Sequence, residues 1–110
     1  MNKYRAKKTV VDGITFDSKA EARRYSQLKI LERAGEISGL TLQPQFPVTL
    51  NGKDICRYIA DFAYFTDHAR VVEDVKSDFT AKNPIYRLKK KLVEAAYPGV
   101  QIVEVTNARR

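Results

Sequence analysis

The chain is short, basic and moderately apolar, and these properties restrict what it can be. It has 110 residues and a net charge of +7, with a pI near 9.6. This length suits one domain with a single modest core. A hydrophobic content of 44% excludes a disordered chain, and no apolar run approaches the roughly 20 residues that a membrane-spanning helix needs.

Charge and cysteine content narrow the partners and the compartment. The basic excess favours a polyanion such as nucleic acid as the partner. The lone cysteine, Cys56, permits neither an internal disulfide nor a cysteine-rich zinc site, which fits a reducing cytoplasm. The first residues, MNKYRAKK, have no apolar stretch behind their charges, so no secretory signal is expected. Residues 1–12 are predicted to form a basic, irregular arm ahead of one domain over residues 13–110.

The first helix is predicted over residues 18–34. Ser18 and Glu21 lie three positions apart and match a capping box, in which each side chain binds a backbone N–H at the helix start. Gly35 then supplies the backbone conformation that commonly ends a helix.

Three strands are predicted next, over residues 46–50, 55–65 and 70–76. Asn51-Gly52 is a strong hairpin signal between the first two strands, and the turn residues 66–68 precede the third. Because strands joined by short turns usually pair with their neighbours, an antiparallel meander is expected.

A second helix is predicted to begin at Pro84, with Asn83 as its N-cap, after a loop over residues 77–83. Its buried stripe is expected to consist of Ile85, Leu88, Leu92 and Ala96. A final strand over residues 100–105 should return through this helix and join the same sheet in parallel. The order α-β-β-β-α-β predicts an α/β fold, with a mixed sheet flanked by helices.

Charged residues interrupt two of the predicted strands. In the sequence VVEDVK at residues 71–76, the alternation of side chains along a strand places Asp74 and Lys76 on one face and Glu73 on the other. Glu73 is therefore expected to be a second-choice metal ligand or a structural partner. Asp61 lies in the preceding strand among apolar residues, where an unpaired carboxylate is costly. Two carboxylates beside an ammonium suit metal-assisted cleavage of a phosphodiester.

Each of these residues also has an ordinary structural interpretation. Asp61, Asp74 and Lys76 would then be surface salt-bridge partners, but the valines around Asp74 favour a covered central strand, where idle charges are costly. Glu21 would serve only the capping box, yet Tyr25 and Leu28 share its helical face and turn it towards the core.

The element order, together with these acids, resembles the PD-(D/E)xK nuclease superfamily, which has the restriction-endonuclease-like fold. Asp61 takes the place of the first acid, although Ala60 stands where proline is usual, and residues 74–76 supply the D-x-K part. Glu21 occupies the place of an additional glutamate from the first helix. The sequences FDSKAE and VEDVK resemble a family of small phage and prophage nucleases. The chain is also similar to phage junction-resolving endonucleases and to the nuclease subunits of some transposases.

This resemblance implies a metal-dependent DNA endonuclease of a phage or prophage, acting in recombination, repair or DNA processing inside a bacterial cell. Mg²⁺ or Mn²⁺ would be held by Glu21, Asp61, Asp74 and the backbone carbonyl of Val75. Lys76 would orient the attacking water or stabilise the transition state. Contacts to the DNA backbone are expected from Lys3, Arg5, Lys7, Lys8, Arg87 and Lys90. A homodimer is expected as well, since cutting two strands in concert needs two sites.

Two other classes of function stay open. One is a catalytically inactive DNA-binding module with the same fold. The other is a basic structural nucleic-acid-binding protein whose acids only form salt bridges. A single histidine argues against histidine-based nuclease mechanisms, and no glycine-rich phosphate loop supports nucleotide hydrolysis.

Overall fold

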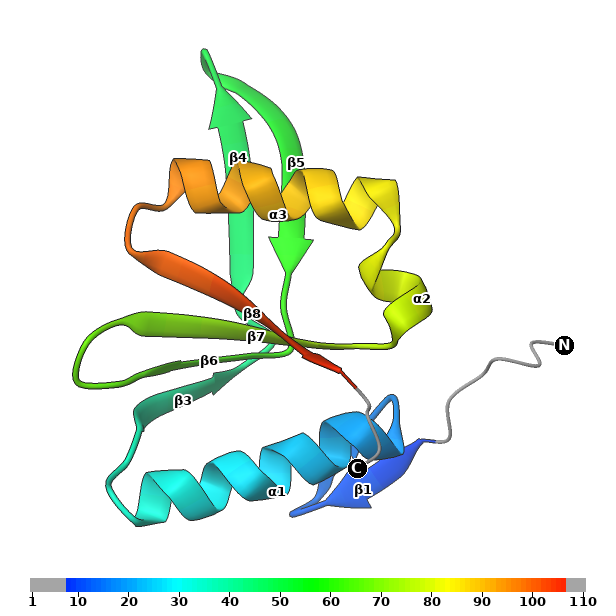
Figure 1. The fold of residues 1–110 in the computed structure, drawn as a ribbon, viewed down its shortest axis with the longest axis vertical. Coiled ribbons are helices and arrows are strands. Elements are labelled where there is room, and N and C mark those ends of the chain that lie inside the picture. Colours follow the sequence, from blue (N-terminus) through cyan, green and yellow to red (C-terminus); the bar gives the residue numbers. More distant parts are fainter. Residues whose placement is uncertain (1–7, 107–110) are drawn as a thin grey trace, which may run out of the picture.

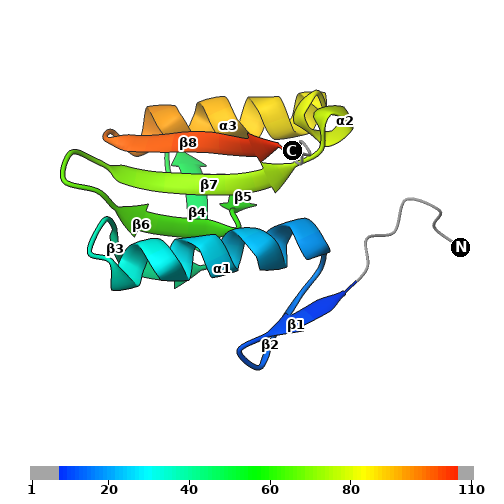
Figure 2. The same cartoon turned by 60° about the horizontal axis from the view of Figure 1, so that its bottom comes forward.

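A four-stranded mixed sheet organises the chain (Figure 1 and Figure 2). The structure is a computed structural model, and it describes residues 8–106. The strands stand in the order β3 (Ser38–Leu42), β6 (Phe62–Phe65), β7 (Arg70–Lys76) and β8 (Val100–Thr106). Strand β7 is antiparallel to β6 and parallel to β8. The predicted α/β class, the central position of residues 70–76 and the parallel final strand are therefore confirmed.

The two long helices, α1 (Lys19–Arg33) and α3 (Pro84–Ala96), cover opposite faces of this sheet (Figure 2). Alternation along β6 turns Phe62 towards α1 and Ala63 towards α3. Along β7 it likewise turns Val71 towards α1 and Val72 towards α3. The chain therefore has two small cores, one on each face, and β7 supplies residues to both.

Helix α1 begins and ends where its sequence predicts. The Ser18 side chain accepts a hydrogen bond of 3.1 Å from the backbone N–H of Glu21, which caps the first turn. Beyond the last turn, Gly35 adopts a φ of +81°, a conformation that residues with a Cβ rarely adopt. Ala22, Tyr25 and Leu28 form the buried face of the helix.

The predicted strand over residues 55–65 is two strands in two different sheets. Strand β5 (Lys53–Ile59) pairs only with β4 (Gln45–Leu50), in a hairpin that crosses α3 and lies apart from the central sheet (Figure 1). Strand β5 ends at Ile59, residues 60–61 belong to no strand, and β6 begins at Phe62. The reason is that the even-numbered residues of the hairpin, such as Phe46 and Tyr58, pack against α3 instead of extending the sheet. The expected antiparallel meander is therefore wrong.

Four short elements were not expected from the sequence. Strand β3 takes the sheet position next to β6, although its sequence SGLTL carries few strand-forming residues. Strands β1 (Thr9–Val11) and β2 (Ile14–Phe16) form a hairpin, so the predicted irregular arm over residues 1–12 is wrong for residues 9–12. Helix α2 (Asp78–Ala81) forms within the predicted loop.

The predicted buried stripe of α3 is wrong for three of its four residues. Ile85, Leu88 and Ala96 are exposed, and the buried residues of the helix are Tyr86 and Val93. Leu92 is partly buried against the core, as expected. Ile85 and Leu88 lie on the side of α3 that faces outward, whereas Tyr86 faces inward and finds a polar partner in Glu104. Within residues 8–106, no helix combines the length and the apolar character needed to cross a membrane.

Two matched leucines test this assignment of the core. Leu28 on α1 is 0% exposed and Leu88 on α3 is 58% exposed. Leu28→Ala should lower the free energy of unfolding by about 2–5 kcal/mol, because it leaves a cavity. Leu88→Ala should change it by no more than about 0.5 kcal/mol. Urea denaturation measures both values, and a large loss for Leu88→Ala would restore the stripe predicted from sequence.

Candidate active site

Asp61 lies where the chain leaves the β4–β5 hairpin and enters the central sheet. Its Oδ2 accepts a hydrogen bond of 2.8 Å from the backbone N–H of Val75, and its own N–H donates to the Glu73 carbonyl at 3.1 Å. Burial raises the pKa of Asp61, and the Val75 N–H opposes that rise. The sequence predicts Asp61 within a strand, on one face with Ile59, Ala63 and Phe65. The structure corrects this prediction, because Asp61 lies between β5 and β6, and of these three neighbours only Ala63 is buried.

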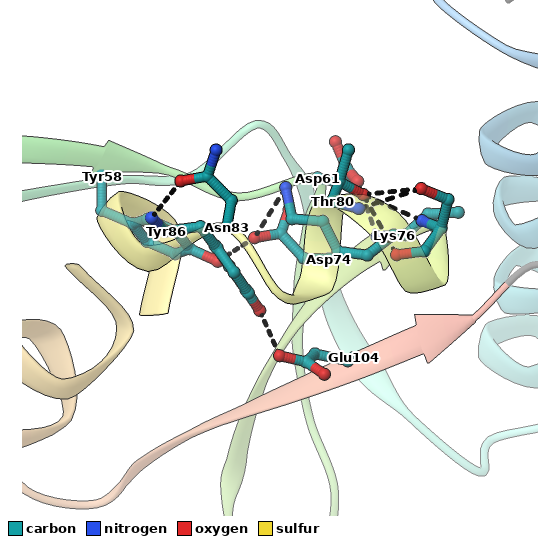
Figure 3. Close-up of polar contacts among 10 residues, drawn as sticks. Tyr58, Asp61, Asp74, Lys76, Thr80, Asn83, Tyr86 and Glu104 are labelled. Atoms are coloured by element: carbon teal, nitrogen blue, oxygen red, sulfur yellow. Dashed lines mark hydrogen bonds and ion pairs between the residues drawn. The ribbon is translucent and has the colours of Figure 1, made fainter. Parts of the chain in front are cut away.

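Asp74 is buried on the α3 face of β7, with 1% of its surface exposed. Its carboxylate accepts a hydrogen bond from the Tyr58 hydroxyl and lies 3.8 Å from Nζ of Lys76 (Figure 3). Burial raises the pKa of Asp74 to about 6, while the Lys76 ammonium and the Asp61 N–H limit the rise. The predicted common face of Asp74 and Lys76 is confirmed.

Polar contacts continue from Lys76 to strand β8 (Figure 3). Its Nζ lies 4.7 Å from the centre of the Tyr86 ring, and the Tyr86 hydroxyl donates a 2.8 Å hydrogen bond to Glu104. Glu104 stands opposite Asp74 in the β7–β8 register, and its charge adds to the raised pKa of Asp74. Sequence analysis missed Tyr58 and Glu104. Glu104 could have been found from the predicted parallel pairing, because the final strand must place one of its residues beside Asp74.

Glu21 reaches the site from the start of α1. Together with Asp61 and Asp17 it lines a cavity of about 150 Å³. Burial raises the pKa of Glu21 to about 7, and the charges of Asp61, Asp17 and Asp74 add to the rise. The structure shows the half of the predicted capping box that Ser18 makes. The backbone N–H of Glu21 is held by the Ser18 cap, while its carboxylate faces the other acids.

Glu73 serves as a structural partner on the α1 face of β7. It is 1% exposed, and the Arg24 guanidinium donates to both of its carboxylate oxygens at 2.7 Å. The Tyr64 hydroxyl donates to the same carboxylate, and burial together with this bond raises the pKa of Tyr64 to about 12. Arg24 lies three residues after Glu21 on α1, so this ion pair fixes the helix that carries Glu21 against the strand that carries Asp74. No feature of the sequence had pointed to Arg24.

The acids suit a hard cation held by few protein ligands. Within residues 8–106, no group of three or more His, Cys, Asp or Glu side chains is arranged to hold a metal ion. The reason is geometric: Glu21 and Asp61 share a cavity, whereas the Asp74 carboxylate is bound to Tyr58. Mg²⁺ commonly needs only one or two carboxylates, with waters and substrate phosphate as its other ligands. The raised pKa values of Glu21 and Asp74 show acids that a cation would stabilise in their charged form.

The predicted DNA contacts fall in different places. Arg87 and Lys90 line a groove of about 310 Å³ with Lys91, Ile102 and Glu104, between α3 and β8. Lys90 also lies 3.4 Å from Glu94, as a half-buried pair on the helix. Lys8 forms a 3.0 Å ion pair with Asp17, beside the Glu21 cavity. Three further candidates lie outside the described residues: Lys3, Arg5 and Lys7.

Comparison with known proteins places the chain in a family. A family model described as "Protein of unknown function (DUF1064)" matches residues 1–110. The chain belongs to the DUF1064 family. Searches of curated proteins and of solved structures gave no match. The chemistry of this DUF1064 protein is therefore inferred from the site itself.

The ion pair between Arg24 and Glu73 predicts how substitutions change the free energy of unfolding. Arg24→Met in the DUF1064 protein should cost about 3–5 kcal/mol, because it leaves the Glu73 charge buried without its partner. Adding Tyr64→Phe and Glu73→Met should recover most of this loss, since apolar groups then replace the whole cluster. The control Lys29→Met breaks a more exposed pair with Glu32 at 3.2 Å and should cost no more than about 1 kcal/mol. Urea denaturation measures all three, and a triple variant as unstable as Arg24→Met would contradict this account.

The same protein should lose stability as the pH rises from about 4 to about 7. Folded-state pKa values of about 7 for Glu21 and about 6 for Asp74 exceed the ordinary values of 4.5 and 3.8. The stabilising contribution of each group is complete below its ordinary pKa and is lost as the pH passes its folded-state pKa. Glu21→Gln cannot ionise and should flatten the fall in Tm, whereas Glu36→Gln at an exposed site should not. Equal slopes for wild type and Glu21→Gln in metal-free buffer would disprove the prediction.

Proposed function

We propose that this DUF1064 protein is a metal-dependent DNA endonuclease with a restriction-endonuclease-like core. The observation that carries the proposal is the junction of Asp61 with residues 74–76. The Asp61 carboxylate binds the N–H of Val75, between an acid and a lysine that share one face of β7. Two acids and a lysine are thereby joined at one end of two adjacent strands. This arrangement supports the D…D-x-K assignment made from the sequence.

The topology supports the same proposal. Without the β1–β2 and β4–β5 hairpins and the short α2, the order is α1-β3-β6-β7-α3-β8. It follows the expected α-β-β-β-α-β order, and the first core strand is β3 instead of the predicted strand over residues 46–50. The β4–β5 hairpin is then an insertion between the first and second core strands.

Asp61 and Asp74 would hold a Mg²⁺ or Mn²⁺ ion, with Glu21 and the backbone carbonyl of Val75 as further ligands. A bound divalent ion would activate a water and neutralise charge on the scissile phosphate. The Tyr58 hydroxyl binds Oδ2 of Asp74, which orients the carboxylate and leaves Oδ1 to act as the ligand. Lys76, held over the Tyr86 ring, presents a fixed positive charge to the phosphate.

DNA is the proposed substrate because of the charge of the protein. The net charge of +7 and the groove that carries Arg87, Lys90 and Lys91 suit a phosphate backbone. A role in phage or prophage recombination, repair or DNA processing remains a prediction from sequence, as does the homodimer.

Cleavage assays test the proposal. Asp61→Asn and Asp74→Asn should each lower the cleavage rate at least about 100-fold, because each removes a charge from the metal site. Lys76→Ala should lower it similarly but leave Mn²⁺ binding intact, since an ammonium is not a metal ligand. Asp54→Asn and Lys53→Ala, at the hairpin tip, are the controls. Labelled duplex, flap, single-stranded and four-way junction DNA are incubated with Mg²⁺ or Mn²⁺, and normal cleavage by either aspartate variant would defeat the assignment.

A catalytically inactive DNA-binding module is the second candidate. It is favoured by one observation, the engagement of the Asp74 carboxylate by Tyr58 away from the Glu21 cavity. Calorimetric titration with Mn²⁺ separates the candidates. An inactive module would bind DNA without binding Mn²⁺, and Tyr58→Phe would not change its metal affinity.

A further inference from the structure

Phe79 is the most exposed of the large apolar side chains in the described part of the chain. It lies on α2 with 86% of its surface exposed. A single exposed apolar side chain is common on protein surfaces, but an aromatic ring held in solvent also offers a flat face on which another ring can stack. Because Phe79 is not part of either core of the described residues, packing within residues 8–106 does not account for it.

The backbone around Phe79 is well ordered by hydrogen bonds. Ser77 and Thr80 form a reciprocal capping box, with bonds of 3.0 Å and 3.1 Å between backbone N–H groups and side-chain oxygens. The N–H of Ala81 donates to the Ser77 carbonyl at 2.9 Å, and Asn83 then caps α3. These bonds fix the direction of the segment, so Phe79 is presented outward by a short rigid turn.

This turn directly follows the proposed catalytic lysine. Helix α2 begins two residues after Lys76, at the end of β7 (Figure 1). Thr80, on the same short helix, is hydrogen-bonded to Ser77, the residue after Lys76 (Figure 3), and α2 contacts β7. Phe79 is therefore only three residues along the chain from the proposed catalytic lysine.

Positive charges follow this aromatic along the chain. Lys82, Arg87 and Lys91 are exposed on the segment that follows, and none of them forms an ion pair with another described residue. Proteins bind single-stranded nucleic acid with positive side chains along the sugar-phosphate backbone and aromatic rings that stack on the bases. An apolar protein partner would leave these charges without counterparts.

We propose that Phe79 stacks on an unpaired base next to the cleaved phosphate. The substrate class is then DNA with unpaired or splayed nucleotides, such as single strands, flaps and branch points. The physical reason is that duplex bases are already covered by stacking on both faces, whereas an unpaired base offers a free face to a ring. This inference rests on the proposed function, because it takes DNA as the ligand.

Binding measurements without divalent metal test the stacking, so cleavage does not enter. The probes are a single-stranded oligonucleotide that carries 2-aminopurine and the duplex of the same sequence. Phe79→Ala should weaken single-strand binding by about 5- to 150-fold and abolish the quenching of 2-aminopurine, while duplex binding changes little. Phe79→Trp should retain both signals. Phe79→Leu, which is apolar but cannot stack, should behave as Phe79→Ala.

Leu50→Ala is the matched control, because Leu50 is 64% exposed at the tip of the β4–β5 hairpin. It should leave binding unchanged, and every variant should keep the wild-type Tm, since the mutated side chains are exposed. Equal weakening on duplex and single strand, or full rescue by Phe79→Leu, would overturn the proposal. Failure of the proposed function is a separate result, namely normal cleavage by Asp61→Asn with the Phe79 effect on binding still present.

Discussion

Two carboxylates are buried back to back on one central strand, and the rest of the structure is arranged around their partners. Glu73 and Asp74 are consecutive residues of β7, so they point to opposite faces of the sheet. A buried charge without a partner costs far more than the net stability of a domain of this size can easily offset. Each face must therefore supply hydrogen-bond donors at the same height along β7.

The partners come from the elements that cover each face. On one side Arg24 of α1 and Tyr64 of β6 satisfy Glu73. On the other side Tyr58 of the β4–β5 hairpin and Lys76 of β7 itself engage Asp74. A helix and a hairpin that do not contact the same core are thus positioned by neighbouring residues of one strand. This explains how α1, which carries Glu21, and the residues between β5 and β6, which include Asp61, reach the same end of β7.

Sequence patterns were sufficient wherever the determinant was local. The Ser18 cap, the turn at Gly35, and the common face of Asp74 and Lys76 follow from short-range rules, and the parallel addition of β8 follows from the helix that precedes it. Sequence patterns could not predict contacts between residues that are far apart in the chain. Arg24 and Glu73 are 49 residues apart, and the sequence around each residue does not indicate that the two form a pair. The end of β5 could not be predicted either, because residues 55–65 have the pattern of one continuous strand. The interruption depends on the packing of the β4–β5 hairpin on α3.

The position of β8 in the sheet has a consequence for biosynthesis. Strand β7 lies between β6 and β8, yet β8 is the last of the described elements to leave the ribosome, after α2 and α3. At about 5–20 residues per second, a valine-rich strand edge stays open in the nascent chain for on the order of seconds. Open edges of this kind are templates for aggregation, and charges within them act as gatekeepers. Glu73, Asp74 and Lys76 supply such charges, so the residues of the site would also protect the nascent chain.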